Sequence, residues 1–228
     1  MIKITNLSKS YGKIKIVDDL SLEIKKGSIF GFLGPNGAGK TTTIKMIVGL
    51  SKPKEGTIEI DEQPIREKRE IIGFMPEDPY FYDHLTALEF LNFMKNLFPI
   101  TDGDSKKILK LVGLEKAANE KVEKFSKGMK QRLGLAQAII NDPDYLFLDE
   151  PLDGLDPIGR REFKEILLKL KKRGKTIFFN SHILSDVEEI CDQIGIIDKG
   201  TLVYSGNVKG FCKNKTLEDA FVDKLISK

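Results

Sequence analysis

A glycine-rich loop constrains the fold of this chain more than any other feature. Residues 34–41 read GPNGAGKT, follow an apolar stretch at 28–33, and lead into residues 41–50, which carry apolar side chains at mostly helical spacing. Glycines in such a loop let backbone N–H groups approach phosphate oxygens, and the lysine reaches the outer phosphates. A strand, this loop and a helix in succession predict a nucleotide-binding α/β domain.

The loop and the start of its helix supply the first set of candidate site residues. The Thr41 hydroxyl can hold magnesium, while backbone N–H groups and the lysine ammonium hold the phosphates. The nucleotide contacts expected here come from Asn36, Gly37, Gly39, Lys40, Thr41 and Thr42.

The size and charge of the chain allow one domain and name no partner. At 228 residues, one substantial hydrophobic core is expected. The 37 basic and 34 acidic side chains give a formal charge of +3, and no block of like charge stands out. The basic stretch 169–173 is interpreted as the solvated end of a helix, where cations complement the helix dipole, rather than as a nucleic-acid patch. No nucleic-acid partner is expected.

Cysteine use and hydropathy indicate the compartment. Cys191 and Cys212 are far apart and lack the spacing of a metal or redox motif, so we expect free thiols in a reducing compartment. The sequence contains no apolar signal region and no run of about 18 apolar residues. The expectation is a soluble, cytoplasmic chain.

Hydrophobic periodicity predicts the order of strands and helices. Residues 2–7 and 20–24 resemble short strands, residues 78–141 are almost wholly helical in pattern, and later apolar runs lie at 145–148, 176–179 and 195–197. Capping signals mark helix starts at Thr86 with Glu89, near Ser105, at Asp156 with Pro157, and near Ser185 with Glu188.

These patterns predict one α/β domain. Alternating strands and helices imply a mainly parallel sheet covered by helices, which makes the expected fold a P-loop NTPase core with an N-terminal antiparallel β subdomain and a helical insertion. The predicted boundaries are 1–77 and 142–228 for the nucleotide-binding core and about 78–141 for the helical subdomain. Leu217, Phe221 and Leu225 lie at helical spacing and predict a terminal helix that packs on the core.

Two acidic residues end an apolar strand. Strand alternation sends the side chains of Asp149 and Glu150 in different directions, so two roles are available. Asp149 can support magnesium and Glu150 can polarise the attacking water, as in phosphate-loop enzymes. The alternative is an acidic loop that caps the sheet.

His182 follows the next predicted strand. A lone histidine is more often a satisfied surface or core residue than a catalytic one. Its position after a strand downstream of Glu150 favours a catalytic role, because an imidazole there could donate to a terminal phosphate or organise Glu150 and the water.

A further segment narrows the family. Residues 125–132 read FSKGMKQR and lie between the helical insertion and the acidic strand. With the glycine loop and the acidic strand end, this segment resembles the signature of ATP-binding cassette (ABC) ATPase subunits, and the resemblance covers residues 11 to about 205. Its substituted form is similar to single-domain subunits of ABC-2-type, drug and peptide exporters.

The resemblance implies further roles. Ser126 and Gly128 would be offered to the terminal phosphate of ATP bound by a second subunit. Tyr11 stands in place of the aromatic residue that stacks on adenine, with a strand-packing tyrosine as the alternative. Residues 152–156 resemble the segment that crosses the dimer interface.

The chain also departs from the family pattern. Glu77 stands where a glutamine is usual, and a carboxylate there could coordinate magnesium more strongly than an amide; a solvated hinge carboxylate is the alternative. Lys127 and Met129 replace the usual glycine and glutamine of the signature.

The resulting functional prediction is an ATP-binding and ATP-hydrolysing transporter subunit that uses ATP and Mg²⁺. Two subunits, identical or related, would pair head to tail around two ATP and drive a separate integral membrane permease, with the chain peripheral on the inner face of the membrane. Residues 79–82 (PYFY) could receive a short helix of that permease, or serve only in insertion-domain packing.

Two alternatives were weighed against this prediction. A soluble, non-transport member of the superfamily acting on ribosome or DNA usually carries two cassettes or a long coiled coil, and this chain fits neither pattern. A small-molecule kinase would use the glycine loop but would leave the signature segment and His182 without a task.

Overall fold

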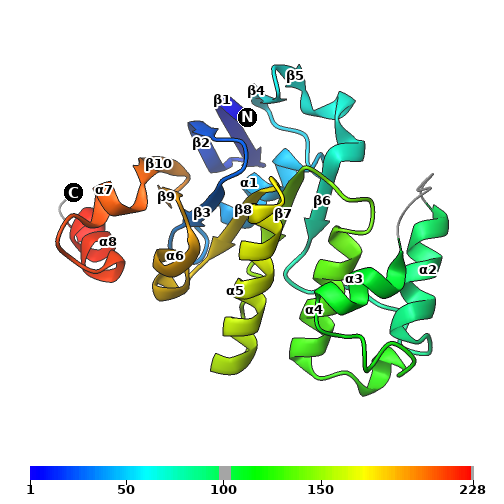
Figure 1. The fold of residues 1–228 in the computed structure, drawn as a ribbon. Helices are drawn as coiled ribbons and strands as arrows, with labels where there is room; N and C mark the ends of the chain where they lie inside the picture. Colours follow the sequence, from blue (N-terminus) through cyan, green and yellow to red (C-terminus); the bar gives the residue numbers. More distant parts are fainter. Residues whose placement is uncertain (98–103, 227–228) are drawn as a thin grey trace. The chain divides into compact units, whose positions relative to one another are not determined.

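The computed structural model describes residues 1–97 and 104–226 (Figure 1). The chain divides into two compact units. Unit 1 combines Met1–Arg69 with Thr176–Lys228, and unit 2 is Glu70–Lys175. Strands and helices alternate in both units, so the predicted α/β class is confirmed.

An antiparallel sheet opens unit 1. It contains β1 (Ile2–Tyr11), β2 (Ile14–Ile24), β4 (Glu55–Ile60) and β5 (Gln63–Pro64) in the order β2-β1-β4-β5. Buried and exposed residues alternate along much of β2, as in a sheet with one covered face. The antiparallel prediction for this end of the chain is confirmed, although both predicted strands are longer than expected and β4 and β5 had not been predicted.

The strand that feeds the glycine loop lies in a second sheet of unit 1. Strand β3 (Ile29–Leu33) pairs in parallel with β8 (Thr176–Ser181) and β9 (Gln193–Asp198), and β10 (Thr201–Asn207) is antiparallel to β9. All five residues of β3 are buried, and the rings of Phe30 and Phe178 stack with centroids 5.5 Å apart. The apolar run thus makes a fully buried central strand.

Four helices accompany the strands in the part of unit 1 that the structure describes. They are α1 (Lys40–Ile47), α6 (Leu184–Ile190), α7 (Val208–Cys212) and α8 (Leu217–Ile226), and a 3₁₀ turn, η1, spans Ile65–Glu67. The terminal helix is confirmed as α8. The cap expected at Ser185 and Glu188 is wrong, because the Glu188 carboxylate accepts the N–H of Leu217 at 3.0 Å and no side chain caps α6.

Unit 2 contains a short parallel strand pair and the helical segment. Strands β6 (Ile72–Met75) and β7 (Tyr145–Asp149) pair in parallel. The helices are α2 (Ala87–Leu97), α3 (Ser105–Leu111), α4 (Lys127–Ala138) and α5 (Pro157–Lys172), with 3₁₀ turns η2 (Arg69–Ile71) and η3 (Val122–Lys124).

Side-chain caps fix several of these helix starts. Thr86 and Glu89 form the predicted capping box, since the backbone N–H of each residue meets the side chain of the other. Asp156 accepts the N–H of Gly159 at 2.6 Å, as predicted for α5. The cap near Ser105 lies one residue earlier than expected, because Asp104 accepts the N–H groups of the first turn. None of the helices in residues 1–97 and 104–226 combines the length and apolar character that crossing a membrane requires.

Candidate nucleotide site

The glycine loop between β3 and α1 is held by backbone geometry. Gly39 occupies the N-cap position of α1 with φ 107°, and no side chain caps this helix. A Cβ at Gly39 would lie 2.7 Å from the carbonyl oxygen of Ile16, so both the positive φ and the close backbone approach require glycine. The exposed tip of the loop, residues 35–37, leaves its backbone accessible.

Lys40 begins α1 and lies along its own loop. Its side chain is buried, and the ammonium donates to the carbonyl oxygens of Gly34 at 2.7 Å and Pro35 at 3.4 Å. Thr41 and Thr42 are half-buried in the first turn, which contains no acidic residue. A buried ammonium and the positive end of a helix therefore converge on this loop, an arrangement that favours a polyanion.

The register of the parallel strands brings His182 to the same sheet edge as the loop. Leu33 of β3 pairs with Ser181 of β8, so Gly34 and His182 continue from adjacent strand ends. Residues Asn180 and Ser181 are buried, whereas His182 is exposed. The edge therefore presents an imidazole beside the predicted phosphate loop within unit 1.

Tyr11 ends β1 with its ring accessible. The residue is 55% exposed, and the Lys9 ammonium lies 5.2 Å from the ring centroid. An exposed aromatic face of this kind can stack on a base.

The predicted acidic pair lies at the end of β7 in unit 2. Asp149 and Glu150 are 2% and 8% exposed, and Glu150 adopts a positive φ of 46°. A positive φ is uncommon for a non-glycine residue and carries some backbone strain. The turn is closed by the N–H of Asp153, which donates to the carbonyl oxygen of Glu150 at 3.1 Å.

Glu77 follows the neighbouring strand end. Met75 of β6 pairs with Leu148 of β7, so the segments that carry Glu77 and Asp149 leave adjacent strands. Partial burial raises the pKa of Glu77, and the nearby carboxylates of Asp149, Asp78, Glu150 and Asp153 raise it further. Within residues 1–97 and 104–226, no three acidic, histidine or cysteine side chains converge as a metal cage. A magnesium ion held by one or two carboxylates plus substrate phosphates needs no such cage.

Gln131 connects Glu77 to the signature helix, a contact that sequence reasoning missed. The side chain is 3% exposed, and its amide donates to the backbone carbonyl of Glu77 at 3.3 Å. Its carbonyl oxygen is buried with no hydrogen-bond partner among the described residues. The segment after β6 is thus attached to α4 through one buried amide.

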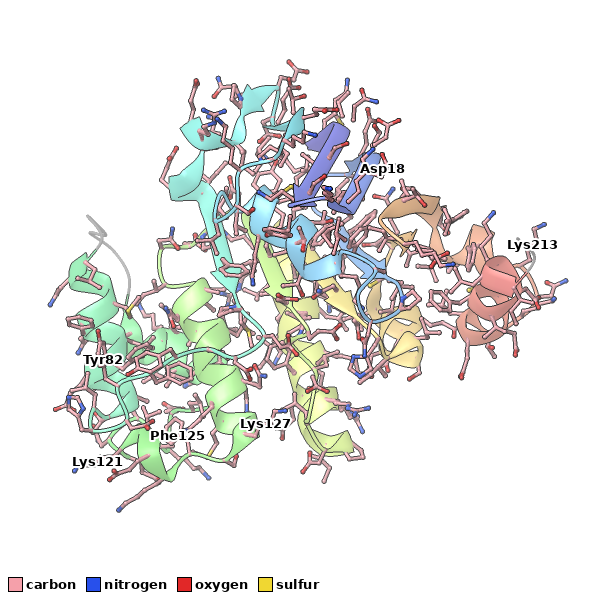
Figure 2. All side chains as sticks on the ribbon, turned by 180° about the vertical axis from the view of Figure 1, so that it is seen from behind. Asp18, Tyr82, Lys121, Phe125, Lys127 and Lys213 are labelled. Carbon is pink, nitrogen blue, oxygen red and sulfur yellow. The ribbon has the colours of Figure 1, made fainter. Side chains whose placement is uncertain are left out.

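The signature segment forms the start of α4. Ser126 is the N-cap, and its hydroxyl accepts the N–H of Met129 at 3.2 Å. Lys127, marked in Figure 2, is exposed and pairs with Asp153 at 3.2 Å. Ser126 and Gly128 line a cavity of about 440 Å³ within unit 2.

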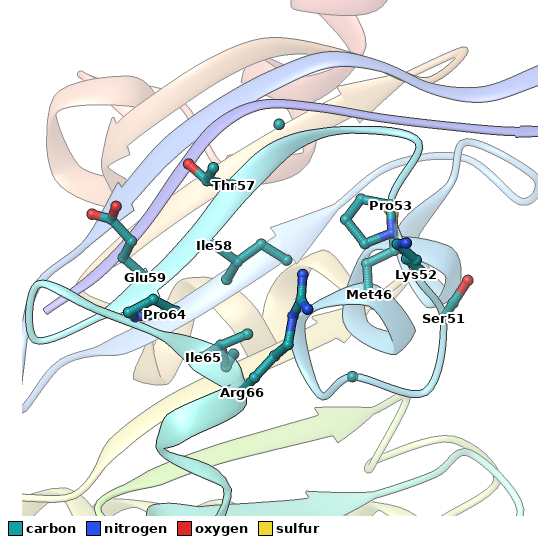
Figure 3. A pocket seen from close by; sticks show the side chains of 12 residues that line it. Met46, Ser51, Lys52, Pro53, Thr57, Ile58, Glu59, Pro64, Ile65 and Arg66 are labelled. Atoms are coloured by element: carbon teal, nitrogen blue, oxygen red, sulfur yellow. The ribbon is translucent and has the colours of Figure 1, made fainter.

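A separate cavity of unit 1 stands apart from the predicted site residues. Figure 3 shows this cavity of about 390 Å³, with Met46, Pro53, Ile58 and Arg66 among its lining side chains. No residue of the loop 34–41 lines it. The nucleotide prediction therefore depends on the exposed loop and the strand ends rather than on this cavity.

Sequence relatives place the chain in a family. A profile described as ABC transporter matches residues 17–153. The chain is 48% identical over 209 residues to the bacitracin transport ATP-binding protein of Bacillus licheniformis, covering 89% of this chain and 68% of that protein. It is 39% identical over 228 residues to the lantibiotic transport ATP-binding protein of Streptococcus pyogenes, covering 99% and 98%.

Coverage differs among the relatives. An uncharacterized ABC transporter ATP-binding protein of Synechocystis sp. is 48% identical over 204 residues, and the match spans 86% of this chain but only 58% of that protein. Thus the chain spans about three-fifths of the length of this relative.

Solved structures agree with the sequence relatives. The ATP-binding subunit of an ABC transporter superposes with a TM-score of 0.88 at 27% identity and covers 99% of both chains. An ATP-binding cassette solved as a dimer in a post-hydrolysis state with ADP and Pi has a TM-score of 0.82 at 27% identity, over 92% of this chain and 100% of that one.

The profile covers more than half of the chain, and the relatives are well above 30% identical, so the chain belongs to the ABC transporter family. Within that family it is of the ATP-binding subunit type, with the ABC ATPase fold.

Proposed function

We propose that this chain hydrolyses ATP as the motor subunit of a transporter, and that this transporter is an exporter. The observation that carries the proposal is that one chain contains two different phosphate-binding half-sites. One is the glycine loop with the buried Lys40 ammonium, and the other is the helix start capped by Ser126. Each can hold phosphate, and neither encloses it.

ATP would be bound by the groups of the first half-site. The Lys40 ammonium and the N–H groups of Gly37 and Gly39 face phosphate, and the Tyr11 ring stacks on the base. For Mg²⁺, the Thr41 hydroxyl and the Asp149 carboxylate are the proposed ligands, with Glu77 as a third. Hard oxygen ligands of this kind suit magnesium, which neutralises developing charge on the phosphates when bound.

Hydrolysis would depend on Glu150 and His182. Strand alternation sends successive side chains in different directions, and Glu150 adds a positive φ of 46° at this point, so one acid would serve the metal and the other the attacking water. The Glu150 carboxylate orients that water and accepts its proton, while the exposed His182 imidazole donates to the terminal phosphate. General-base assistance of this kind contributes roughly 10² to 10⁴-fold.

The second half-site implies a partner. Ser126, Gly128 and the N–H groups that begin α4 would contact the terminal phosphate held by a second subunit in a head-to-tail dimer. A related cassette that superposes on this chain was solved as a dimer, which supports the proposal. Both half-sites are present here, so a homodimer satisfies the chemistry as well as a heterodimer does.

An exposed aromatic patch supports a membrane partner. Tyr80 and Tyr82 are 82% and 42% exposed, and the Tyr82 ring packs edge-on against Phe93 at 5.5 Å. Phe81 differs, because it is buried and packs on Phe90 at 5.2 Å. The two tyrosines are therefore the residues proposed to receive a short helix of an integral membrane permease, and this contact would hold the chain at the inner face of the membrane.

The central test replaces the proposed base. In the full chain, Glu150→Gln should leave ATP binding intact, slow phosphate release by roughly 10² to 10⁴-fold, and accumulate a dimer in ATP by light scattering. Glu165→Gln, at an exposed site on α5, is the matched control and should behave as the parent. Rapid turnover by Glu150→Gln would exclude Glu150 as the base.

The membrane partner has its own test. The chain is co-expressed with a candidate integral membrane permease and recovered from the membrane fraction. Tyr80→Ala should reduce this recovery without changing the thermal midpoint of the purified chain. Val222→Ala, an exposed apolar change on α8, should leave recovery unchanged. Normal membrane recovery of Tyr80→Ala would count against docking at the tyrosines.

A further inference from the structure

Lys127 occupies an electrostatically unusual position. It is the first residue of α4, where the helix dipole is positive, and the first turn contains no acidic residue. Cations at this end are disfavoured, yet Lys130 of the next turn adds another, paired with Asp83 at 3.4 Å. The start of α4 therefore concentrates positive charge, and the helix's own first turn supplies no carboxylate to balance it.

The charge of Lys127 is balanced by Asp153, a carboxylate that is distant in the sequence and close in space. The ammonium lies 3.2 Å from Asp153 Oδ2, and the two side chains are 53% and 40% exposed. Exposed ion pairs are weak because water screens them and both side chains lose freedom. The pair is thus one that a stronger anion can replace.

The lysine stem lies flat across Gly154. This glycine has φ 66°, and a Cβ there would lie 2.5 Å from Lys127 Cε and 2.8 Å from Cδ. The contact ties the signature segment to the turn after β7, the same turn that the N–H of Asp153 joins to Glu150. Whatever moves the ammonium of Lys127 therefore removes a restraint on the segment that follows Glu150.

We propose that Lys127 exchanges partners during the ATP cycle: Asp153 in the open chain, and the terminal phosphate of the partner subunit's ATP in the closed dimer. The exchange rests on the proposed head-to-tail dimer. A terminal phosphate carries more charge than one carboxylate and is less exposed to water once enclosed, so its contact with the ammonium is stronger. Because ADP lacks the terminal phosphate, Lys127 then favours ATP over ADP. When the Lys127 ammonium leaves Asp153, the turn at 153–156 loses that restraint.

The test measures ATP-driven dimerisation by light scattering in the full chain carrying Glu150→Gln. Lys127→Met should weaken dimerisation roughly 10-fold or more, the loss of one charged contact, and Lys127→Arg should restore most of it. Asp153→Asn should instead strengthen dimerisation about 2- to 5-fold, because the competing carboxylate is gone. In the Lys127→Met background, Asp153→Asn should have no effect, and with ADP none of these variants should differ.

The sign of the Asp153→Asn effect separates exchange from a fixed tether. A tether predicts that Asp153→Asn and Lys127→Met both weaken dimerisation, and that result would overturn the proposal. Equal thermal midpoints of the free chains show that neither variant acts through folding. If the Glu150→Gln parent forms no dimer in ATP, that result contradicts both the proposed head-to-tail dimer and the proposed exchange. If the parent dimerises and neither substitution changes its dimerisation, only the exchange is contradicted.

Discussion

The two phosphate-facing helix starts of this chain are built in opposite ways. The glycine loop before α1 has no side-chain cap, requires glycine at position 39, and buries its lysine against its own carbonyl oxygens. The start of α4 has a serine cap and an exposed lysine. In the glycine loop the lysine is held by carbonyl oxygens of its own loop, whereas at the start of α4 the lysine side chain is exposed to solvent. The difference is what a site divided between two subunits would need.

Removing the lysine of the glycine loop should have the largest effect on ATP binding. Lys40→Ala should lower ATP affinity roughly 10- to 100-fold, because a charged contact to phosphate is lost. Titration calorimetry of the full chain measures this. Lys45→Ala removes the same charge from an exposed site of α1 and should bind ATP normally; unchanged binding by Lys40→Ala would contradict the assignment of this loop to ATP binding.

Glycine-to-alanine changes sharpen the comparison further. Gly39→Ala should cost roughly 1–3 kcal/mol of unfolding free energy, since it forces a side chain into a positive-φ site against backbone. At Gly128 a Cβ would meet Leu155 Cδ2 at an ordinary 3.5 Å, so alanine there should leave stability within about 1 kcal/mol of the parent while weakening the ATP-driven dimer. Denaturant unfolding and light scattering report the two quantities, and equal unfolding energies for both variants would contradict the contrast.

The smallest expected effect concerns the cap. Ser126→Ala should destabilise the chain by about 1 kcal/mol, because the N–H of Met129 loses its acceptor. Ser126→Asn supplies another capping oxygen and should recover the stability, though not the contact that a hydroxyl makes with phosphate. Denaturant midpoints test the first statement, and a midpoint for Ser126→Ala equal to that of the parent would show that the cap contributes nothing.

Local chemistry explains which features the sequence could predict. The glycine loop, the Thr86 with Glu89 box and the Asp156 cap depend on residues within a few positions of one another, so their patterns are legible in the chain. Strands β4 and β5 were missed because β4 begins with three exposed residues and has only two apolar side chains, and the edge strand β5 is two exposed residues long. Such short segments take their shape from the strands beside them rather than from their own pattern.

Contacts between distant segments explain the rest. The expected Glu188 cap failed because the Glu188 carboxylate accepts the backbone N–H of Leu217, which lies 29 residues away in the sequence. Gln131 with Glu77, and Lys127 with Asp153, likewise join residues 54 and 26 positions apart. Such pairs are fixed by tertiary packing and leave no periodic signal. The sequence alone shows that Glu77 and Lys127 differ from the usual family residues. Their contacts with Gln131 and Asp153 are shown only by the structure.

The stem of Lys127 across Gly154 also has an evolutionary meaning. A side chain at position 154 would occupy the volume that the stem of Lys127 fills in this structure, so the residue at one position bears on the conformation available at the other. A descendant that acquires alanine at 154 must displace the lysine, and one that loses the lysine releases 154 from the crowding, although φ 66° still favours glycine there. Inheritance of the pair as a unit would therefore mark the lineages in which this pairing is under selection.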